Sequence, residues 1–332
     1  MQVPHRGRTA AIALGAVVVL ALVCFASVMV GNKNIPPGQV WDALTGRGEA
    51  YVTVVVESRY PRTVLGVLVG AGLAVSGVLM QAVTRNPLAE PGLMGINTGA
   101  AASVVAASAF LGASGQTQLL LWALPGALLA GVFVHLIGGR GAGSSPARLV
   151  LAGAVLTAVL SAFIQAVTLS SPQTFDSYRY WVVGALTGRT FEAVWTVLPL
   201  IAVGLVVALS LGRSLNAVAL GEESATALGA RPARVRAVGL LTAVVLSAGA
   251  TAAAGPIVFV GLAVPHLVRA LVGVGMRRQV LFAALLGPIL LLLADVVGRV
   301  LVRPQELMVG VVTAFAGAPA LLVAVRRMRA TK

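Results

Sequence analysis

Long uncharged apolar runs alternate with short polar segments along the whole chain. The clearest run, at residues 63–84, is long enough to cross a bilayer as a helix. Gly66 and Gly70 lie about one helical turn apart within it, a spacing that lets a neighbouring helix approach closely. The run stops at NPLAEPG, residues 86–92, because two prolines and a glycine do not continue a helix. The pattern predicts a membrane helix followed by a turn.

The repetition of this pattern predicts an all-α integral membrane protein with about ten transmembrane helices in one domain, residues 1–332. The runs are continuous rather than alternating, which argues against a β-barrel. An aromatic segment, residues 170–189, fits an interfacial belt or a short re-entrant helix. The predicted spans are residues 9–30, 62–84, 93–112, 117–138, 148–169, 191–212, 237–254, a stretch after Gly255 ending near residue 272 and interrupted at Pro265, 279–298 and 307–325.

Composition and charge agree with a multi-pass membrane protein. The chain is 58% hydrophobic and 10% charged, whereas a soluble domain carries about 25% charged residues. Its net charge of +14 does not indicate nucleic-acid binding, because the basic residues sit in short clusters between the apolar runs. With both termini in the cytoplasm, the inner segments hold 16 basic and 3 acidic residues and the outer segments hold 8 and 7. This asymmetry supports a multi-pass protein of the cell membrane with cytoplasmic termini.

The chain offers little catalytic chemistry of its own. Its single cysteine, Cys24, permits no intrachain disulfide, and its three histidines are scattered, so no metal site is expected. No nucleophile–base pair is visible within a span, which disfavours an intramembrane enzyme. A Walker A loop requires a lysine, and the only lysines are Lys33 and Lys332. Any ATP and Mg²⁺ would therefore be bound by a separate polypeptide, and this chain is expected to bind no cofactor.

Two features of the membrane segments admit more than one interpretation. Arg62 and Arg236 each open a span that ends in a Pro-Gly-rich break, which suggests an inverted internal repeat. Breaks of this kind are also common in unrelated membrane helices. Asp295 is the only acid near a span core and could serve a proton relay, but an i,i+4 pair with Arg299 is simpler. Asn97, Thr98 and Gln165 could line a pathway or join helices by hydrogen bonds.

Four stretches, in order, resemble the FecCD-type permeases, which are the membrane subunits of ABC importers for iron-siderophores, haem and cobalamin. They are RYPRTVLGVLVGAGLAVSGVLMQAVTRNPLAEPGLMG at 59–95, ALGEESATALG at 219–229, GPIVFVGLAVPHLVR at 255–269 and ADVVGRVLVRPQELMVGVVTAFAGAP at 294–319. The resemblance, which includes the cobalamin importer permease, implies a type II ABC importer architecture with ten spans. It implies a transport subunit rather than an enzyme. An iron(III)-siderophore is the favoured cargo, with haem or cobalamin as alternatives and an ion-gradient-driven transporter as a further one.

The resemblance also implies partners and site residues. The partners are a second permease, identical or paralogous, two ATPase subunits, an extracytoplasmic substrate-binding protein and the lipid bilayer. Arg59, Arg62 and Arg299 would face carboxylates of the binding protein, although arginines near helix ends often only snorkel. The segment that couples to the ATPase would comprise Leu220, Gly221, Glu222, Glu223, Ala227, Leu228, Gly229 and Arg231.

Local rules give that coupling segment a shape. Glu222 and Glu223 suit the first turn of a helix, where the helix dipole favours acids. Gly229 suits the stop, and Pro232 prevents continuation. An ordinary capped surface helix would look the same. The residues expected at turns or helix breaks are Asn86, Pro87, Glu90, Pro91, Gly92, Gly255, Pro256 and Pro265.

Overall fold

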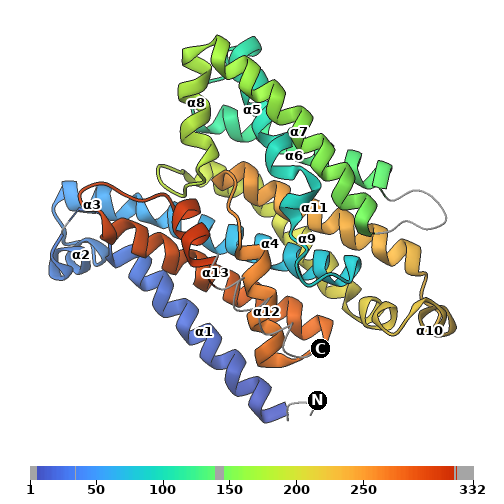
Figure 1. Cartoon of the computed structure of the whole chain (residues 1–332). Helices are drawn as coiled ribbons and strands as arrows, with labels where there is room; N and C mark the ends of the chain where they lie inside the picture. The colour runs from blue at the N-terminus through green and yellow to red at the C-terminus, as the bar shows by residue number, and fades with distance from the viewer. Residues whose placement is uncertain (1–5, 34, 139–145, 318, 320–332) are drawn as a thin grey trace.

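The computed structural model describes residues 6–33, 35–138, 146–317 and 319, and none of these lies in a strand. The helices are numbered in chain order in Figure 1. They are α1 (Arg6–Met29), α2 (Pro37–Leu44), α3 (Ala50–Glu57), α4 (Arg59–Thr84), the 3₁₀ helix η1 (Pro91–Met94), α5 (Ile96–Leu111), α6 (Gln116–Gly138), α7 (Pro146–Ser170), α8 (Pro172–Val182), α9 (Phe191–Ala219), α10 (Glu222–Ala227), α11 (Pro232–Ala254), α12 (Val260–Val272) and α13 (Met276–Leu301).

The all-α membrane fold predicted from the apolar runs is confirmed. Among the described residues, seven helical stretches are long and apolar enough to cross a membrane, and α5 and α12 are shorter apolar helices. Nine predicted spans thus correspond to helices, with ends that shift by several residues. Residues 309–317 are also helical and begin the tenth predicted span. The rest of that span lies largely outside the described residues, as do residues 1–5 and 320–332 at the two termini.

Helix α4 lies at the centre of the molecule, between a group containing α5, α6 and α7 and a group containing α1, α12 and α13 (Figure 1). The glycines of α4 let its neighbouring helices pack closely against it. A methyl group added at Gly70 would lie 2.6 Å from the backbone nitrogen of Pro288 in α13. One added at Gly77 would collide with the carbonyl of Gly261 in α12. The small-residue face read from the sequence is therefore the surface on which two other helices pack.

Helices α4 and α11 pack in antiparallel directions. Val83 lies near Gly239, Ser76 donates a 2.6 Å hydrogen bond to the carbonyl of Ala243, and Gly72 approaches Leu246. Residue numbers fall along one helix as they rise along the other. The two helices that open the proposed repeat thus have opposite orientations, as an inverted repeat requires. The repeat itself stays a prediction.

The two predicted helix breaks meet in space. After α4, Arg85 adopts the left-handed conformation and the side chain of Asn86 accepts a hydrogen bond from the backbone N–H of Leu88. The carboxylate of Glu90 then accepts a 3.0 Å hydrogen bond from the backbone N–H of Phe259, in the break before α12. Pro91 opens η1. The Glu90 side chain thus provides an acceptor for a backbone N–H that has no partner in the interrupted helix.

The expected interruption at Pro265 is wrong. Helix α12 runs unbroken from Val260 to Val272 with Pro265 inside it. The break lies earlier, where Gly255 has φ +76° and is followed by Pro256. A proline removes the hydrogen bond to the carbonyl four residues earlier, here that of Gly261, and its ring crowds that carbonyl. That carbonyl faces Gly77 of α4, so neighbouring packing accommodates the proline.

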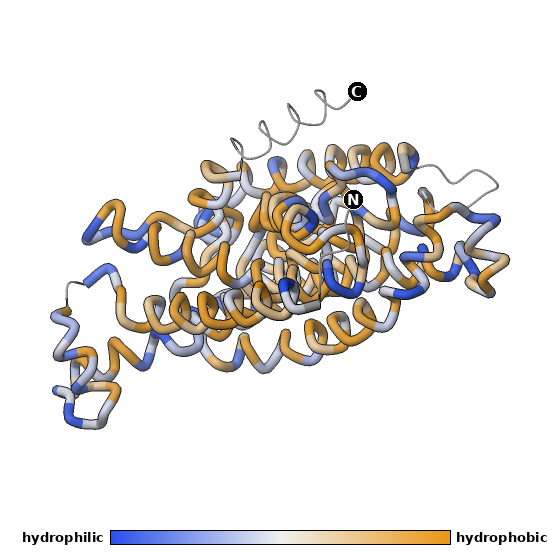
Figure 2. The backbone as a smooth tube through the Cα atoms, turned by 90° about the horizontal axis from the view of Figure 1, so that it is seen from below, coloured by the Kyte–Doolittle hydropathy of each residue, from blue (hydrophilic) through white to orange (hydrophobic). Residues whose placement is uncertain are grey.

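Apolar side chains cover the outside of the bundle as well as its interior. Figure 2 shows hydrophobic residues along the long helices and hydrophilic residues gathered mainly in the turns and short helices. Helices α1 and α7 are the most exposed, with 17% and 11% of their most apolar windows buried. Outward-facing leucines and valines on a helix match a hydrocarbon environment or another membrane subunit.

Candidate docking and coupling sites

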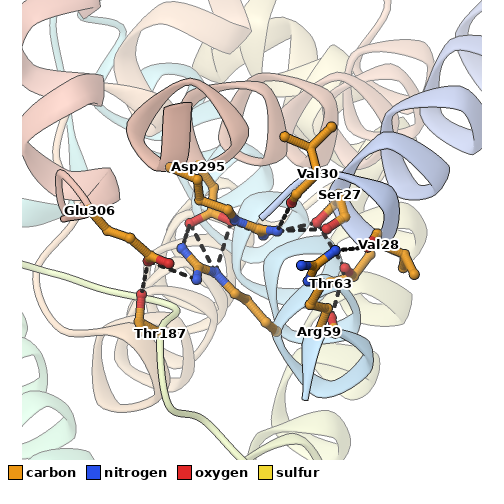
Figure 3. Close-up of polar contacts among 10 residues, drawn as sticks. Ser27, Val28, Val30, Arg59, Thr63, Thr187, Asp295 and Glu306 are labelled. Carbon is orange, nitrogen blue, oxygen red and sulfur yellow. Dashed lines mark hydrogen bonds and ion pairs between the residues drawn. The ribbon is translucent and has the colours of Figure 1, made fainter. Parts of the chain in front are cut away.

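A buried ion-pair cluster joins α4 to α13 at one end of the bundle (Figure 3). Arg62, in the first turn of α4, donates to both carboxylate oxygens of Asp295 at 2.7 and 3.0 Å and to Glu306 at 2.9 Å. Arg299, in the last turn of α13, donates to the same Asp295 carboxylate. The side chains of Asp295 and Arg299 are 1% exposed. The predicted i,i+4 pair is confirmed, and Arg62 shares its acid.

Three arginines also donate to backbone carbonyls in the last turn of α1 and in the two residues after it. Arg59 donates to Val28 and Met29, Arg299 to Ser27 and Val30, and Arg303 to Gly31. The last carbonyls of a helix have no partner within the helix, and positive charge is favourable there. Helix α1 has no basic residue in its own last turn. The cations therefore come from α4, α13 and the segment after α13, and they fix α1 against both helices.

The arginines predicted to dock a binding protein lie deep in this cluster. Arg59, Arg62 and Arg299 are 6%, 8% and 1% exposed. These three arginines neither snorkel into solvent nor point outward as free cations. Their guanidinium groups donate to acids or carbonyls of this chain. Contact with a partner at Arg62 or Arg299 would require exchange of an internal ion pair. Their docking role stays a prediction.

The cluster forms one wall of a partly open hollow of about 700 Å³. Glu306 sits in the hollow, where its carboxylate accepts from Arg62 and from the hydroxyl of Thr187 at 2.9 Å. The hollow also contains Arg189, from the turn between α8 and α9, which is 8% exposed. Burial lowers the pKa of Arg189 to about 10. The site is therefore rich in cations, of which only some are matched by acids.

The predicted coupling segment forms the short helix α10, which follows the C-terminal end of α9 and so lies at the opposite end of that helix from Arg189. Glu222 and Glu223 occupy its first turn, as expected from the helix dipole. Gly229 has φ +79°, its N–H donates to Thr226, and the N–H of Ala230 donates to Ala225. This pair of bonds is the Schellman motif that ends a helix at a glycine. Pro232 then begins α11, so the local prediction is confirmed.

Helix α10 is held at its base and exposed at its ends. Glu222 pairs with Arg236 of α11 at 2.6 Å, and Ala225 is fully buried. Leu220 and Leu228, which flank the helix, are 70% and 67% exposed. Each end of this anchored helix thus presents one exposed leucine in the part of the chain described. The arrangement suits a rigid element that contacts another protein.

The polar residues considered for a pathway gather between α5, α7 and α8. Asn97, Thr98 and Gln165 line a pocket of about 250 Å³ together with Tyr178. Asn97 also accepts a 3.0 Å hydrogen bond from the hydroxyl of Thr251 in α11. The interhelical hydrogen bond expected for Asn97 is therefore confirmed. A pathway role for Asn97, Thr98 and Gln165 stays a prediction.

Sequence reasoning missed Glu306, Arg189 and Ser27, whose side chains complete the site around the ion-pair cluster. Glu306 and Arg189 belong to segments read as outer loops, and nothing in their local sequence links them to Arg62. Ser27 is buried within α1 and bonds to Thr63 at 2.8 Å. The sequence does contain a signal for these partners, which is its shortage of acids. It has ten Asp and Glu against 24 Lys and Arg, so each acid near the end of a span is a candidate partner for an arginine.

The fold and these sites define a multi-pass α-helical membrane protein with an arginine-rich hollow at one end of the bundle and a short helix between two spans at the other. Residues 19–327 match the FecCD transport family, and the chain belongs to that family of transport permeases.

The chain is 43% identical to the ferric enterobactin transport system permease protein FepD of Escherichia coli, over 96% of each protein. It is 40% identical to the Fe(3+)-citrate import system permease protein YfmD of Bacillus subtilis, over 88% of this chain and 86% of YfmD. Its fold matches a metal-chelate type ABC transporter in an inward-facing conformation with a TM-score of 0.83, 28% identity and coverage of 95% and 99%.

Proposed function

We propose that the chain is the membrane-spanning subunit of an ATP-driven importer and that α10 couples it to a separate ATPase. The observation that carries this proposal is α10 itself, a short helix stopped at Gly229 and anchored to α11 through Glu222 and Arg236. Because its base is fixed, a push on Leu220 or Leu228 is transmitted to α9 and α11 rather than absorbed by a flexible loop. ATP and Mg²⁺ would be bound by two ATPase subunits, and this chain would contribute no catalytic residue.

The proposed cargo is an iron(III)-siderophore. FepD and FepG are named for ferric enterobactin, and other relatives are named for ferric hydroxamate and ferric citrate. These cargoes share one chemistry, a bulky iron(III) chelate with oxygen ligands. Haem and cobalamin are the alternatives. A binding protein would deliver the chelate to the end of the bundle that holds Arg62 and Asp295.

The assembly is proposed to contain two permease chains that enclose the pathway between them. FepD and FepG are both named as permease proteins of ferric enterobactin transport, which favours a paralogous partner. The outward face of α7, with Leu151, Val155 and Val159 more than half exposed, offers a surface for that partner beside the polar pocket at Asn97. The single permease domain would lie in the cell inner membrane with both termini in the cytoplasm.

Reconstitution tests this proposal. The chain, its partner permease and the ATPase are placed in proteoliposomes, and uptake of ⁵⁵Fe-labelled ferric enterobactin is measured with the binding protein outside and ATP inside. We expect uptake that requires both ATP and binding protein. Uptake driven by a proton gradient without ATP would contradict the proposal. Uptake of haem or cobalamin in preference to the ferric chelate would overturn the cargo while leaving the mechanism.

A further inference from the structure

Two arginines from different helices meet where α9 packs against α13. A methyl group added at Gly212 of α9 would collide with the side chain of Arg277 and lie 3.1 Å from its backbone nitrogen. Arg213 is the next residue of α9, and both arginines are exposed. The side chain of Asn216, one turn further along α9, accepts a 3.0 Å hydrogen bond from the backbone N–H of Met276. The joint between α9 and α13 therefore presents two neighbouring exposed arginines.

The acids of the chain do not neutralise these two arginines. All ten Asp and Glu residues lie in the part of the chain that the structure describes, and none of the ion pairs there includes Arg213 or Arg277. Of the three acids predicted on the inner side, Glu90 and Glu222 have partners elsewhere, and Glu223 lies exposed on α10. The positive charge at the joint is therefore left without an internal counter-charge among the described residues.

The inner bias of basic residues explains the presence of these charges but not their placement. That bias depends on how many Lys and Arg lie near the ends of the spans, and it does not require two of them to meet. Like charges repel when they are brought together, so the proximity of Arg213 and Arg277 disfavours the fold unless a counter-charge is present. An anion from outside the chain accounts for the pair.

An apolar surface continues from the two arginines along both helices. On α9, Val206 lies two turns before Arg213 and is 66% exposed. On α13, Leu281 follows Arg277 by one turn and is 51% exposed. Residues four or seven positions apart share a face of a helix, so each arginine has an exposed apolar side chain in line with it. A ligand that matches the whole surface has an anionic head and a hydrocarbon tail.

We propose that Arg213 and Arg277 bind the phosphate of an anionic phospholipid of the inner leaflet, whose acyl chain lies on Val206 and Leu281. This inference rests on the proposed orientation, in which this end of α9 faces the cytoplasm. Both arginines lie next to the ends of predicted spans, which is the level of the lipid head groups. Guanidinium groups bind phosphate oxygens through paired hydrogen bonds, and basic sites between membrane helices suit anionic head groups.

The apolar part of this surface favours a lipid over an acidic surface of the ATPase. Val206 and Leu281 belong to helical stretches that are long and apolar enough to cross a membrane. A cytoplasmic protein would reach the arginines but not these side chains, whereas a phospholipid contacts both. The bound lipid would also hold α13 against α9, the helix that leads into α10.

The test measures binding of phospholipid to the purified permease–ATPase complex by native mass spectrometry. Phosphatidylglycerol is the anionic lipid and phosphatidylcholine is the lipid without net charge. We expect the double variant Arg213→Gln, Arg277→Gln to bind phosphatidylglycerol about tenfold more weakly, because each cation near the membrane surface attracts anionic lipid. Its binding of phosphatidylcholine should not change. The matched control is Arg47→Gln, Arg179→Gln, which removes two exposed charges away from the joint and should change the affinity by less than about twofold.

Three further measurements separate lipid binding from other roles. In detergent without added lipid, the double Gln variant should keep the melting temperature of the unmodified complex, because both arginines are exposed and lack an internal ion pair. Added phosphatidylglycerol should raise that temperature less in the variant than in the unmodified complex. Arg213→Lys with Arg277→Lys should keep most of the binding, because an ammonium group also pairs with phosphate. Glycerol 3-phosphate should not compete at the concentration of the lipid, because it lacks the acyl chain.

The inference is overturned if the double Gln variant and its control bind phosphatidylglycerol alike. Competition by glycerol 3-phosphate would also overturn it, since the site would then bind a free phosphate. Unchanged lipid binding with loss of the ATPase from the double Gln variant would assign the two arginines to the ATPase instead. Lipid binding is measured without transport, whereas absence of ATP-driven uptake would refute the proposed function. The two failures are therefore distinguishable.

Discussion

Arg62 and Asp295 lie 233 positions apart in the sequence and form a two-point ion pair with contacts of 2.7 and 3.0 Å. Because Arg299 shares the same carboxylate, Asp295 neutralises two guanidinium groups from two helices. The pair fixes the first turn of α4 against the last turns of α13. The end of the bundle proposed to receive the binding protein is thus built on one buried acid.

Asp295→Asn should destabilise the permease by about 3–5 kcal/mol, since it leaves two buried arginines without their counter-charge. The measurement is thermal unfolding of the purified protein, in which size-exclusion chromatography detects the fraction that stays folded after heating. Asp176→Asn is the control, because its pair with Arg179 at 3.1 Å is largely exposed. We expect a loss under about 1 kcal/mol there. Equal losses in the two variants would contradict the assigned role of Asp295.

Gly70→Ala should destabilise the fold by roughly 1–3 kcal/mol, because the added methyl group meets the backbone of α13 at Pro288 and a backbone cannot turn aside. Gly15→Ala provides the comparison within a helix. No atom lies within 4 Å of a methyl group added there, so alanine should be neutral or mildly stabilising. The same unfolding assay measures both. A stable Gly70→Ala protein would mean that α4 and α13 are not in close contact.

Gly229→Pro should leave the permease inserted but unable to retain its ATPase. Proline cannot adopt φ +79° or donate the bond to Thr226, so the end of α10 would be rebuilt. Gly46→Pro is the matched control. Gly46 follows the short helix α2, has φ +76° and donates to Ala43, yet it lies in a turn predicted outside. Co-purification of the ATPase should be lost only in the first variant.

Single cysteines test the orientation in a Cys24→Ser background. A cysteine at Ser224, exposed on α10, should react with a membrane-impermeant maleimide only from the cytoplasmic side. One at Gln173, exposed on α8, should react only from outside. The reason is the inner bias of basic residues. Labelling of Ser224→Cys in intact cells would reverse the proposed topology and place α10 where no ATPase can reach it.

The original docking hypothesis predicts that changing Arg59, Arg62 and Arg299 together to glutamate abolishes binding-protein-dependent transport. The structure gives a second reason for the same loss, since the change would place acids around Asp295 and remove the caps of α1. Measurement of unfolding beside transport separates the two. We expect the triple variant to lose stability as well as transport.

The sequence by itself determined the class of fold, most of the helices, and the local shape of the coupling segment. Apolar runs long enough to span a bilayer can be recognised from consecutive residues alone. The same is true of the glycine spacing in α4 and of the first-turn acids and Gly229 of α10. The pair of Asp295 and Arg299 was equally local, because residues four apart on a helix face each other.

Only the tertiary structure decided which charges meet. The sequence predicts that Arg62 faces a carboxylate of a partner protein, but the structure neutralises it with Asp295 from another helix. The sequence predicts a break at Pro265, but α12 continues through it, and the Gly261 carbonyl that the proline leaves without a helical bond faces Gly77 of α4. The common reason is that the energy of a charge or a helix break depends on what surrounds it. Those surroundings come from segments that the linear sequence does not place together.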